Sequence, residues 1–276
     1  MVEHKAKGDV KPRADNKVKP RDDDKAAEPE NDLWPPKAPN IHSLDIVDLI
    51  ELKPIAFANS LLYKLKGCRK AYKSGGSQRE FEIMNAADEC SVKAHGLTLL
   101  RDCCGQVSAT GFIMDLETPL DPKTVEPGRH RLLMGQMISV VLALHSKGIV
   151  HGDIKPANML LCSDGKVRLC DFSEARRVSN DLDDWHGETT VNYMSPFRCR
   201  NWPDGPDPPP TIEDDLYGLG LSIWELYTGK VPFEQDYIDD ILDYVKTGQT
   251  VDVDEVKEEG VRETIRKYLR YGGSKV

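Results

Sequence analysis

Two short stretches decide how this sequence is interpreted: HGDIKPAN at residues 151–158 and DFS at residues 171–173. Between them, the turn dipeptide Asp164-Gly165 predicts a β-hairpin. Because a hairpin returns the chain close to where it left, we expect Asn158 and Asp171 to become neighbours in space. Two oxygen-bearing side chains suit Mg²⁺, which takes few protein ligands and completes its shell with phosphates and water. The two stretches therefore predict a magnesium site at one end of a hairpin.

Asp153 and Lys155 add a reaction to this site. Asp153 precedes Asn158 by five positions in the same stretch, close enough for its carboxylate to accept a proton from an attacking hydroxyl. Lys155 follows two positions later and can neutralise charge that gathers on a transferring phosphoryl group. The candidate catalytic residues are Asp153, Lys155 and Asn158, and the candidate metal ligands are Asn158 and Asp171.

The two stretches together resemble the catalytic loop, H-R-D-x-x-x-x-N, and the metal loop, D-F-G, of the protein kinase family. Further landmarks of that family follow in order over roughly residues 50–270. The resemblance implies an α+β, two-lobed protein kinase-like fold, with a small β-rich N-lobe that carries one main helix and a larger, mainly α-helical C-lobe. It also implies ATP and Mg²⁺ as cofactors.

The first landmarks lie near residues 70–80. Lys70-Ala71-Tyr72-Lys73 resembles the V-A-I-K strand, so Lys73 is the expected ligand of the ATP α- and β-phosphates and Ala71 an expected nucleotide-binding residue. Glu80, at the start of the expected regulatory helix, is the expected partner of Lys73, because an ammonium group needs a carboxylate to hold it in one geometry. Glu82 is the alternative partner.

The later landmarks concern the nucleotide and the peptide substrate. Met114-Asp115-Leu116-Glu117 resembles the hinge between the lobes, whose backbone at residues 115–117 is expected to meet adenine. Residues 187–196 resemble the end of an activation segment, in which Thr190 helps to define the peptide-binding floor. In the family the Asp of the central helix, here Asp215, braces the catalytic-loop backbone.

The loop that covers the phosphates departs most from the family pattern. The family has glycines in G-x-G-x-x-G, whereas this chain has Ile55, Phe57 and Ser60 at those positions. Glycines let backbone amides approach phosphate closely. The departure therefore predicts weaker ATP binding or a loop that closes differently, and it is the main argument for a non-catalytic relative.

Three further departures lie in the expected large lobe. Ser173 replaces the glycine of D-F-G and is expected to restrict the excursions of that loop. Gly152 replaces the Arg that pairs with an activation-segment phosphate, so we expect activity that needs no such phosphate, in a segment that already carries acidic residues at 181, 183, 184 and 188. Phe197 replaces the Glu of A-P-E, where apolar packing is expected to substitute for a buried ion pair.

Composition and periodicity divide the chain into parts. Residues 1–40 hold nine basic and nine acidic residues and almost no large apolar side chain before Leu33, so we expect a disordered charged tail. The N-lobe is expected at residues 41–114, the hinge at 115–117 and the C-lobe at 118–276. The expected elements are strands at 60–65, 69–73, 97–100, 110–114, 159–162 and 167–170, and helices at 78–87, from 131 to near Gly148, and at 214–227, 237–245 and 261–269.

Charge and hydropathy exclude several classes of protein. With 46 acidic and 37 basic residues and a net charge of -9, the surface repels phosphate backbones and anionic membranes, so we expect no nucleic-acid or membrane partner. The longest apolar stretch, Met137–Leu144, is too short to span a bilayer. The seven cysteines and the absence of a secretory signal indicate reduced thiols in an intracellular protein, cytoplasmic or nuclear. A monomer is assumed.

The leading hypothesis is an active protein kinase that transfers the ATP γ-phosphate to Ser or Thr hydroxyls of protein substrates, because Lys155 resembles the serine/threonine pattern. Two alternatives stay open. A small-molecule phosphotransferase of related fold is favoured by H-G-D, but not by the Thr190–Pro196 segment or the Asp215 helix. A pseudokinase that binds nucleotide and scaffolds partners is favoured by the missing glycines, but not by the intact set of polar residues at 73, 153, 158 and 171.

Overall fold

The computed structural model of the chain describes residues 40–42, 46, 49–51, 53–57, 61–101, 103–179, 190–201, 208–234 and 236–276. All of these residues belong to one unit, Pro35–Val276. The expected tail lies outside the described residues up to position 39, as do the acidic positions 181–188 and Ser60. Asn40 is already part of a strand.

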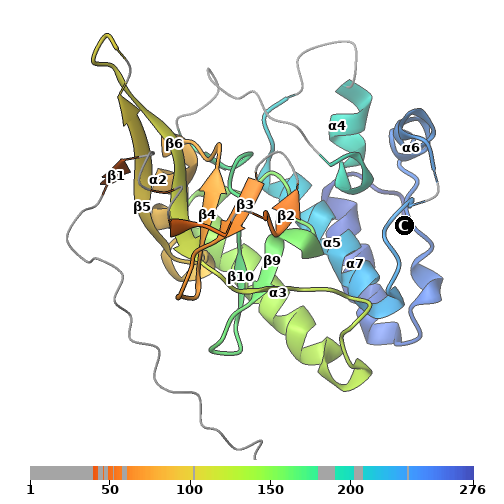
Figure 1. Cartoon of the computed structure of the whole chain (residues 1–276). Helices are drawn as coiled ribbons and strands as arrows, with labels where there is room; N and C mark the ends of the chain where they lie inside the picture. Colours follow the sequence, from red (N-terminus) through yellow and green to blue (C-terminus); the bar gives the residue numbers. More distant parts are fainter. Residues whose placement is uncertain are drawn as a thin grey trace, which may run out of the picture. The chain divides into compact units, whose positions relative to one another are not determined.

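A six-stranded sheet forms the N-terminal part of this unit, in the order β1-β5-β6-β4-β3-β2 (Figure 1). Neighbouring strands are antiparallel, except that β1 pairs in parallel with β5. Both strand pairs expected in this part are confirmed. The strands are β1 (Asn40–His42), β2 (Ala56–Phe57), β3 (Leu61–Lys64), β4 (Lys70–Ser74), β5 (Ala94–Arg101) and β6 (Val107–Asp115).

Helix α2 (Gln78–Ala87) follows the β3–β4 hairpin and has the bounds that the sequence predicts. The Ser77 hydroxyl accepts a hydrogen bond from the backbone N–H of Glu80 at 3.0 Å, which satisfies one of the amides left free at a helix start. Ile83 and Met84 are buried against the sheet, and Glu80 is buried with them at 3% exposure. A carboxylate at such a position needs a charged or hydrogen-bonding partner.

The C-terminal part is mainly helical and is built around α5 (Figure 1). Thr211 and Asp214 form a capping box at the start of α5, and every residue from Asp214 to Leu226 is buried. The predicted helices are confirmed, and the short α4 is an addition. The helices are α3 (His130–Ser146), α4 (Pro196–Asn201), α5 (Ile212–Thr228), α6 (Ile238–Val245) and α7 (Glu259–Tyr271). None of them, within the described ranges, is long and apolar enough to cross a membrane.

Short ribbons and single helical turns connect these elements. The predicted hairpin is confirmed as β9 (Met159–Leu161) and β10 (Val167–Leu169), with β7 (Thr118–Pro119) added beside β9. A second ribbon pairs β8 (Ile149–Val150) with β11 (Arg176–Arg177). The 3-10 turns are Asp88–Cys90, Pro127–Arg129, Pro156–Asn158, Val191–Tyr193 and Val253–Glu255.

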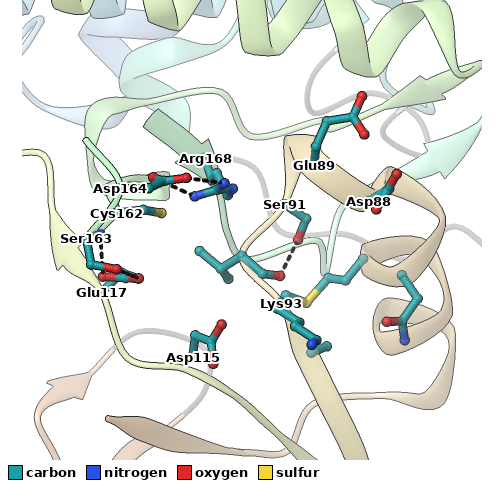
Figure 2. Close-up of a pocket in the computed structure, with 14 residues that line it drawn as sticks. Asp88, Glu89, Ser91, Lys93, Asp115, Glu117, Cys162, Ser163, Asp164 and Arg168 are labelled. Carbon is teal, nitrogen blue, oxygen red and sulfur yellow. Dashed lines mark hydrogen bonds and ion pairs between the residues drawn. The ribbon is translucent and has the colours of Figure 1, made fainter. Parts of the chain in front are cut away.

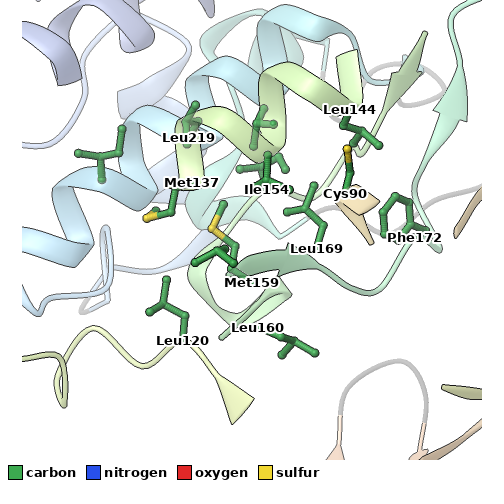
Figure 3. Close-up of a cluster of buried hydrophobic side chains, with 14 of the residues drawn as sticks. Cys90, Leu120, Met137, Leu144, Ile154, Met159, Leu160, Leu169, Phe172 and Leu219 are labelled. Carbon is green, nitrogen blue, oxygen red and sulfur yellow. The ribbon is translucent and has the colours of Figure 1, made fainter. Parts of the chain in front are cut away.

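One apolar core supports the ribbons from both sides (Figure 3). Met159, Leu169 and Phe172 are fully buried in it, and the same cluster includes Ala71 of the sheet and Leu219 of α5. Burial of one large apolar side chain contributes about 1.5–3 kcal/mol. The stretches at residues 151–158 and 171–173 are therefore anchored in the same apolar core. The fold is the predicted α+β arrangement of a sheet-rich part followed by a helical part.

Candidate active site

The backbone of the His151–Asn158 loop is held by a carboxylate of the central helix. Asp215, which is 2% exposed, accepts hydrogen bonds from the backbone N–H groups of His151 at 2.7 Å and Gly152 at 2.8 Å. Its Oδ2 atom also lies 2.8 Å from Nε2 of His145. The predicted bracing of this loop by Asp215 is confirmed.

Gly152 occupies a place that admits no side chain. Its φ is +83°, a conformation that L-residues with a side chain rarely adopt. A Cβ atom there would lie 2.7 Å from the carbonyl oxygen of Glu174 and 2.8 Å from Cγ of Pro210. The backbone conformation of this loop thus requires glycine at position 152 and excludes the family's Arg.

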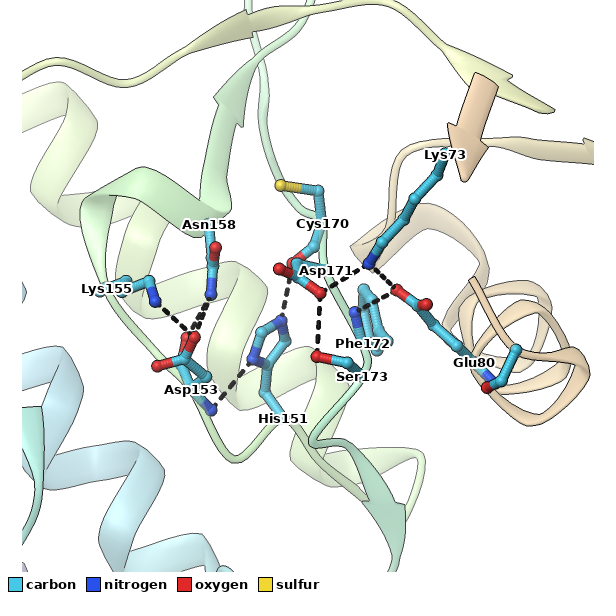
Figure 4. A network of polar contacts seen from close by, with 11 residues as sticks. Lys73, Glu80, His151, Asp153, Lys155, Asn158, Cys170, Asp171, Phe172 and Ser173 are labelled. Carbon is cyan, nitrogen blue, oxygen red and sulfur yellow. Dashed lines mark hydrogen bonds and ion pairs between the residues drawn. The ribbon is translucent and has the colours of Figure 1, made fainter. Parts of the chain in front are cut away.

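Asp153 has one occupied and one unoccupied carboxylate oxygen. Its Oδ2 accepts hydrogen bonds from Nζ of Lys155 at 2.6 Å and from Nδ2 of Asn158 at 2.8 Å (Figure 4). The side chain is buried, and Oδ1 has no hydrogen-bond partner. The loop therefore fixes the carboxylate and leaves one oxygen as an unused acceptor.

Lys155 links this loop to Thr190, at the end of the expected activation segment. Its Nζ also donates to Oγ1 of Thr190 at 2.6 Å. The sequence places Thr190 at the peptide-binding floor but does not predict this contact, because 35 residues separate the two partners. Lys155 thus holds Asp153 and Thr190 around a single ammonium group.

The β9–β10 hairpin brings Asn158 and Asp171 together as expected. The backbone N–H of Cys170 donates to the carbonyl oxygen of Asn158 at 3.0 Å, which ties the two ends of the hairpin. His151 packs its ring 4.8 Å from that of Phe172 and contacts the carbonyl oxygen of Cys170 at 3.0 Å. In Figure 4 the amide oxygen of Asn158 lies on the side away from Asp153. This oxygen and the Asp171 carboxylate are the available metal ligands.

The Asp171 backbone and side chain are both constrained. Its φ is +58°, which is uncommon for a residue with a side chain. The Ser173 hydroxyl donates to Oδ1 of Asp171 at 3.0 Å. The serine in place of the D-F-G glycine therefore adds a hydrogen bond that a glycine lacks.

Lys73 joins the sheet to the hairpin through two carboxylates. Its Nζ lies 2.5 Å from Oε1 of Glu80 and 2.7 Å from Oδ1 of Asp171 (Figure 4). Burial lowers the pKa of Lys73, but the two carboxylates outweigh burial and raise it above the usual 10.5. Burial likewise raises the pKa of Asp171, and Lys73 outweighs it and lowers that pKa. Lys73 and Asp171 are therefore both charged at neutral pH.

Glu80, and not its alternative Glu82, pairs with Lys73. The Oε1 atom of Glu80 also accepts the backbone N–H of Phe172 at 3.1 Å, so one carboxylate positions both the lysine and the Asp171–Ser173 segment. Glu82 instead accepts a hydrogen bond from Gln78 at 2.7 Å on the exposed side of α2.

The residues that the sequence predicts as the hinge lie at and just after the end of β6. Ala71 is paired with Met114 across β4 and β6, and both are buried. The backbone N–H of Asp115 donates to Lys93 O and that of Leu116 to Arg69 O, each at 3.0 Å. All three predicted hinge residues are described, and the backbone N–H of Glu117 has no backbone partner among the described residues. It is therefore the hinge N–H group that could bind a ligand.

A cavity of about 450 Å³ lies beside the hinge (Figure 2). The side chains of Asp115 and Glu117 line it, together with Lys93 and Asp164. Asp115 is held there by His95 at 2.5 Å, and Glu117 by Arg69 at 3.2 Å. Two side chains of the predicted hinge, Asp115 and Glu117, thus line this cavity, whereas none of the predicted catalytic or metal-binding residues does.

The residues present fit Mg²⁺ and a nucleotide. The described residues hold no cluster of three or more side chains that would bind a metal without help. Asn158 and Asp171 alone offer two oxygen ligands, which suits an ion that takes the rest of its shell from phosphates and water. Asn158 contacts Asp153, whose Oδ1 is unpartnered, and Asp171 pairs with the charged Lys73. Of the three phosphate-loop positions, Ile55 has a described side chain, 48% exposed.

The prediction for Phe197 is wrong, and two hydroxyl–carboxylate hydrogen bonds near it were not predicted. Phe197 is 48% exposed, so apolar packing by this side chain does not substitute for the missing ion pair, as the sequence had suggested. Instead, the Ser195 hydroxyl donates to buried Asp214 and ties the segment to α5. Tyr193 similarly donates to Glu225. Hydroxyl–carboxylate pairs of this kind leave no local sequence signal.

The profile of the protein kinase domain matches residues 82–270. This chain belongs to the protein kinase domain family. The match begins two residues after Glu80, so Lys73, Glu80 and the phosphate-loop positions lie before it. The placement of Lys73 and Glu80 within the kinase domain rests on their contacts with Asp171 and Phe172.

Several curated protein kinases are similar to this chain. Dual specificity protein kinase Ttk of Danio rerio is 29% identical over 164 residues, which cover 56% of this chain and 17% of the relative. Human dual specificity mitogen-activated protein kinase kinase 7 is 28% identical over 59% of this chain and 41% of its own length. Probable serine/threonine-protein kinase PknB of Lactococcus lactis is 32% identical over 38% of this chain and 16% of its own length. The chain thus spans less than half of each of these relatives.

Proposed function

We propose that this chain is a protein kinase that uses ATP and Mg²⁺ to phosphorylate Ser and Thr hydroxyls of protein substrates. The observation that carries the proposal is the Asp153 carboxylate, with Oδ2 fixed by Lys155 and Asn158 and a buried Oδ1 that lacks a donor. A buried polar atom without a partner costs about 1–3 kcal/mol. A substrate hydroxyl that donates to Oδ1 removes this cost and is positioned for proton transfer.

The other polar residues divide the remaining tasks. Asn158 and Asp171 would hold Mg²⁺, and Lys73, fixed by Glu80, would bind the α- and β-phosphates. Bound Mg-ATP supplies the phosphoryl group and the divalent charge that stabilises its transfer.

Asp153 accepts the hydroxyl proton, and the adjacent Lys155 ammonium stabilises negative charge near it. Ala71, Met114, Asp115, Leu116 and Glu117 would form the adenine site, with the free backbone N–H of Glu117 as its hydrogen-bond donor.

The preference for Ser and Thr and the lobe boundaries are parts of the same proposal. Lys155 contacts both Asp153 and Thr190, which supports the serine/threonine pattern, and the relatives' names include serine/threonine and dual specificity kinases.

We assign the N-lobe to residues 41–114, the hinge to 115–117 and the C-lobe to 118–276. The end of β6 at Asp115 supports this division.

A phosphoryl-transfer assay tests the proposed function. The full chain is incubated with γ-labelled ATP, Mg²⁺ and a generic basic protein, and phosphoamino acids are identified after hydrolysis. We expect labelled phosphoserine or phosphothreonine from the unsubstituted protein. We expect a loss of at least about a hundredfold in rate with Asp153→Asn, because the proton acceptor is removed.

Two results would contradict this proposal. Thermal stabilisation by Mg-ATP without transfer in either protein would indicate the pseudokinase alternative. Label in a small hydroxylated compound, and none in protein, would indicate the small-molecule phosphotransferase.

A further inference from the structure

A groove of about 460 Å³ lies on the helical part, between the C-terminal end of α5, the helix α6 and the chain that follows α6. Its floor is aromatic and aliphatic, and is formed by Trp224, Phe233, Tyr244 and Val251. The rings of Phe233 and Tyr244 meet edge to face, with centroids 6.2 Å apart. Tyr244 remains 47% exposed, so the groove presents an aromatic surface to solvent.

Four exposed carboxylates border this floor from two directions: Asp236 and Asp240 at α6, and Asp252 and Glu255 at the following turn. Lys230 pairs with Glu255 at 2.7 Å. Within the described ranges, Asp236 and Asp240 have no ion-pair partner. The border of the groove therefore carries unneutralised negative charge.

Two pairs of acidic residues lie in α6 or just before it, and one of these pairs lines the groove. Asp240 and Tyr244 are four residues apart in α6 and share the face that lines the groove, and Asp236 lines it from the turn that precedes the helix. Asp239 and Asp243 do not line the groove, and Asp243 pairs with Lys246. Asp239 and Asp243 of α6 thus supply a control pair with the same number of carboxylates in the same region.

Direct packing connects the groove to the candidate active site. Phe233 packs against the cluster that contains Met194 and Val191. Val191 follows Thr190, whose hydroxyl lies 2.6 Å from Nζ of Lys155. The groove is therefore connected by packing to the segment around Thr190.

We infer that this groove docks a basic segment of the protein substrate. This inference rests on the proposed function, because only a kinase that acts on proteins has such a substrate. An Arg or Lys side chain would lay its apolar stem on the aromatic floor and place its charged end between the carboxylates. An acidic or uncharged segment would leave those carboxylates without partners. The net charge of -9 attracts the same partners over longer distances.

Fluorescence anisotropy with a labelled peptide tests the groove without catalysis. The probe is a peptide of roughly eight residues, about 26 Å when extended, that alternates arginine with leucine. It is titrated with the full chain in the absence of nucleotide at low salt. We expect the double variant Asp236→Asn/Asp240→Asn to bind roughly threefold to tenfold more weakly, and Tyr244→Ala to bind more weakly as well. The control Asp239→Asn/Asp243→Asn should bind within about twofold of the unsubstituted protein.

Two outcomes would overturn the inference. Equal weakening by both double variants would show general attraction by charge rather than a docking site. Equal binding of a peptide with glutamine in place of arginine would show an apolar partner.

A kinetic arm separates this inference from the proposed function. The same basic segment is joined to a serine-containing peptide and used as substrate. We expect Asp236→Asn/Asp240→Asn to raise KM and leave kcat unchanged. Peptide binding that depends on the groove without any transfer would contradict the proposed function alone, whereas transfer with an unchanged KM would contradict the docking groove alone.

Discussion

Gly152 and Asp153 are neighbours in the chain, and different physical requirements fix them. Gly152 is required by a positive φ and by the close approach of Glu174 and Pro210. Asp153 is positioned by two hydrogen bonds to one of its oxygens, which leaves the other oxygen available. At the scale of single residues, the site therefore depends on one backbone conformation and one side-chain geometry.

Gly152→Ala should destabilise the protein by about 2 to 4 kcal/mol, because the positive φ and the two close contacts each add a cost. Denaturant unfolding measures this. Gly260→Ala is the matched control, since a Cβ there meets nothing within 4 Å, and it should leave stability unchanged or raise it slightly. Equal unfolding midpoints for the two variants would show that the position tolerates a side chain.

Glu225 should make stability depend on pH. Burial raises its pKa from 4.5 to about 7. An acid with a raised pKa in the folded state stabilises fully below its unfolded pKa, and this contribution is lost as pH rises through the folded pKa. Glu225→Gln keeps an acceptor for Tyr193 but cannot ionise. Relative to the unsubstituted protein, the variant should gain about 1 to 3 kcal/mol between pH 5 and pH 8. A stability difference that is the same at both pH values would contradict this account.

Helix α5 and the β9–β10 hairpin are the elements that assemble the site. Asp215 at the start of α5 binds the loop backbone, and the hairpin ties Asn158 to Cys170 beside Asp171. Each element places a polar group at the end of a rigid, buried structure. The positions of the site residues therefore depend on packing some distance away from the chemistry.

Asp215→Ala should remove the support of the loop. Two buried backbone N–H groups, of His151 and Gly152, would lose their acceptor, at about 1–3 kcal/mol each. We expect a loss of about 2 to 5 kcal/mol in stability and faster amide hydrogen exchange at these two residues. The control Thr211→Ala, which removes a cap of the same helix, should cost about 1 kcal/mol and leave exchange in the loop unchanged. Equal exchange in the two variants would show that Asp215 does not hold the loop.

The sequence predicts those elements whose signals are local. The dipeptide Asp164-Gly165 predicts the hairpin, and apolar spacing predicts α2, α3 and α5–α7. The strands β1, β2, β7, β8 and β11 were not predicted, because each has two or three residues, too few for a periodic pattern. The contacts of Lys155 with Thr190 and of Ser173 with Asp171 likewise follow from the three-dimensional path of the chain. Motif spacing identified the polar residues of the site, and packing determined their geometry.

On the scale of the whole molecule, one ion-pair network connects the sheet to the helical part. Lys73 comes from β4, Glu80 from α2 and Asp171 from the segment after β10. The three side chains are brought together only when both parts are folded and in contact. The candidate nucleotide site is thus a property of the assembled unit rather than of either part.

Calorimetric titration with Mg²⁺ and a non-hydrolysable ATP analogue tests most directly whether these groups form a nucleotide site. The unsubstituted protein should bind the analogue with a measurable heat. Asp171→Asn should weaken binding by roughly tenfold or more, since it removes a charge of the metal site (about 1.4 kcal/mol per factor of ten). Asp153→Asn removes the proton acceptor but keeps an amide oxygen that can accept from Lys155 and Asn158, so it should bind as before. No heat with the unsubstituted protein, or equal affinities for the unsubstituted protein and Asp171→Asn, would contradict the account.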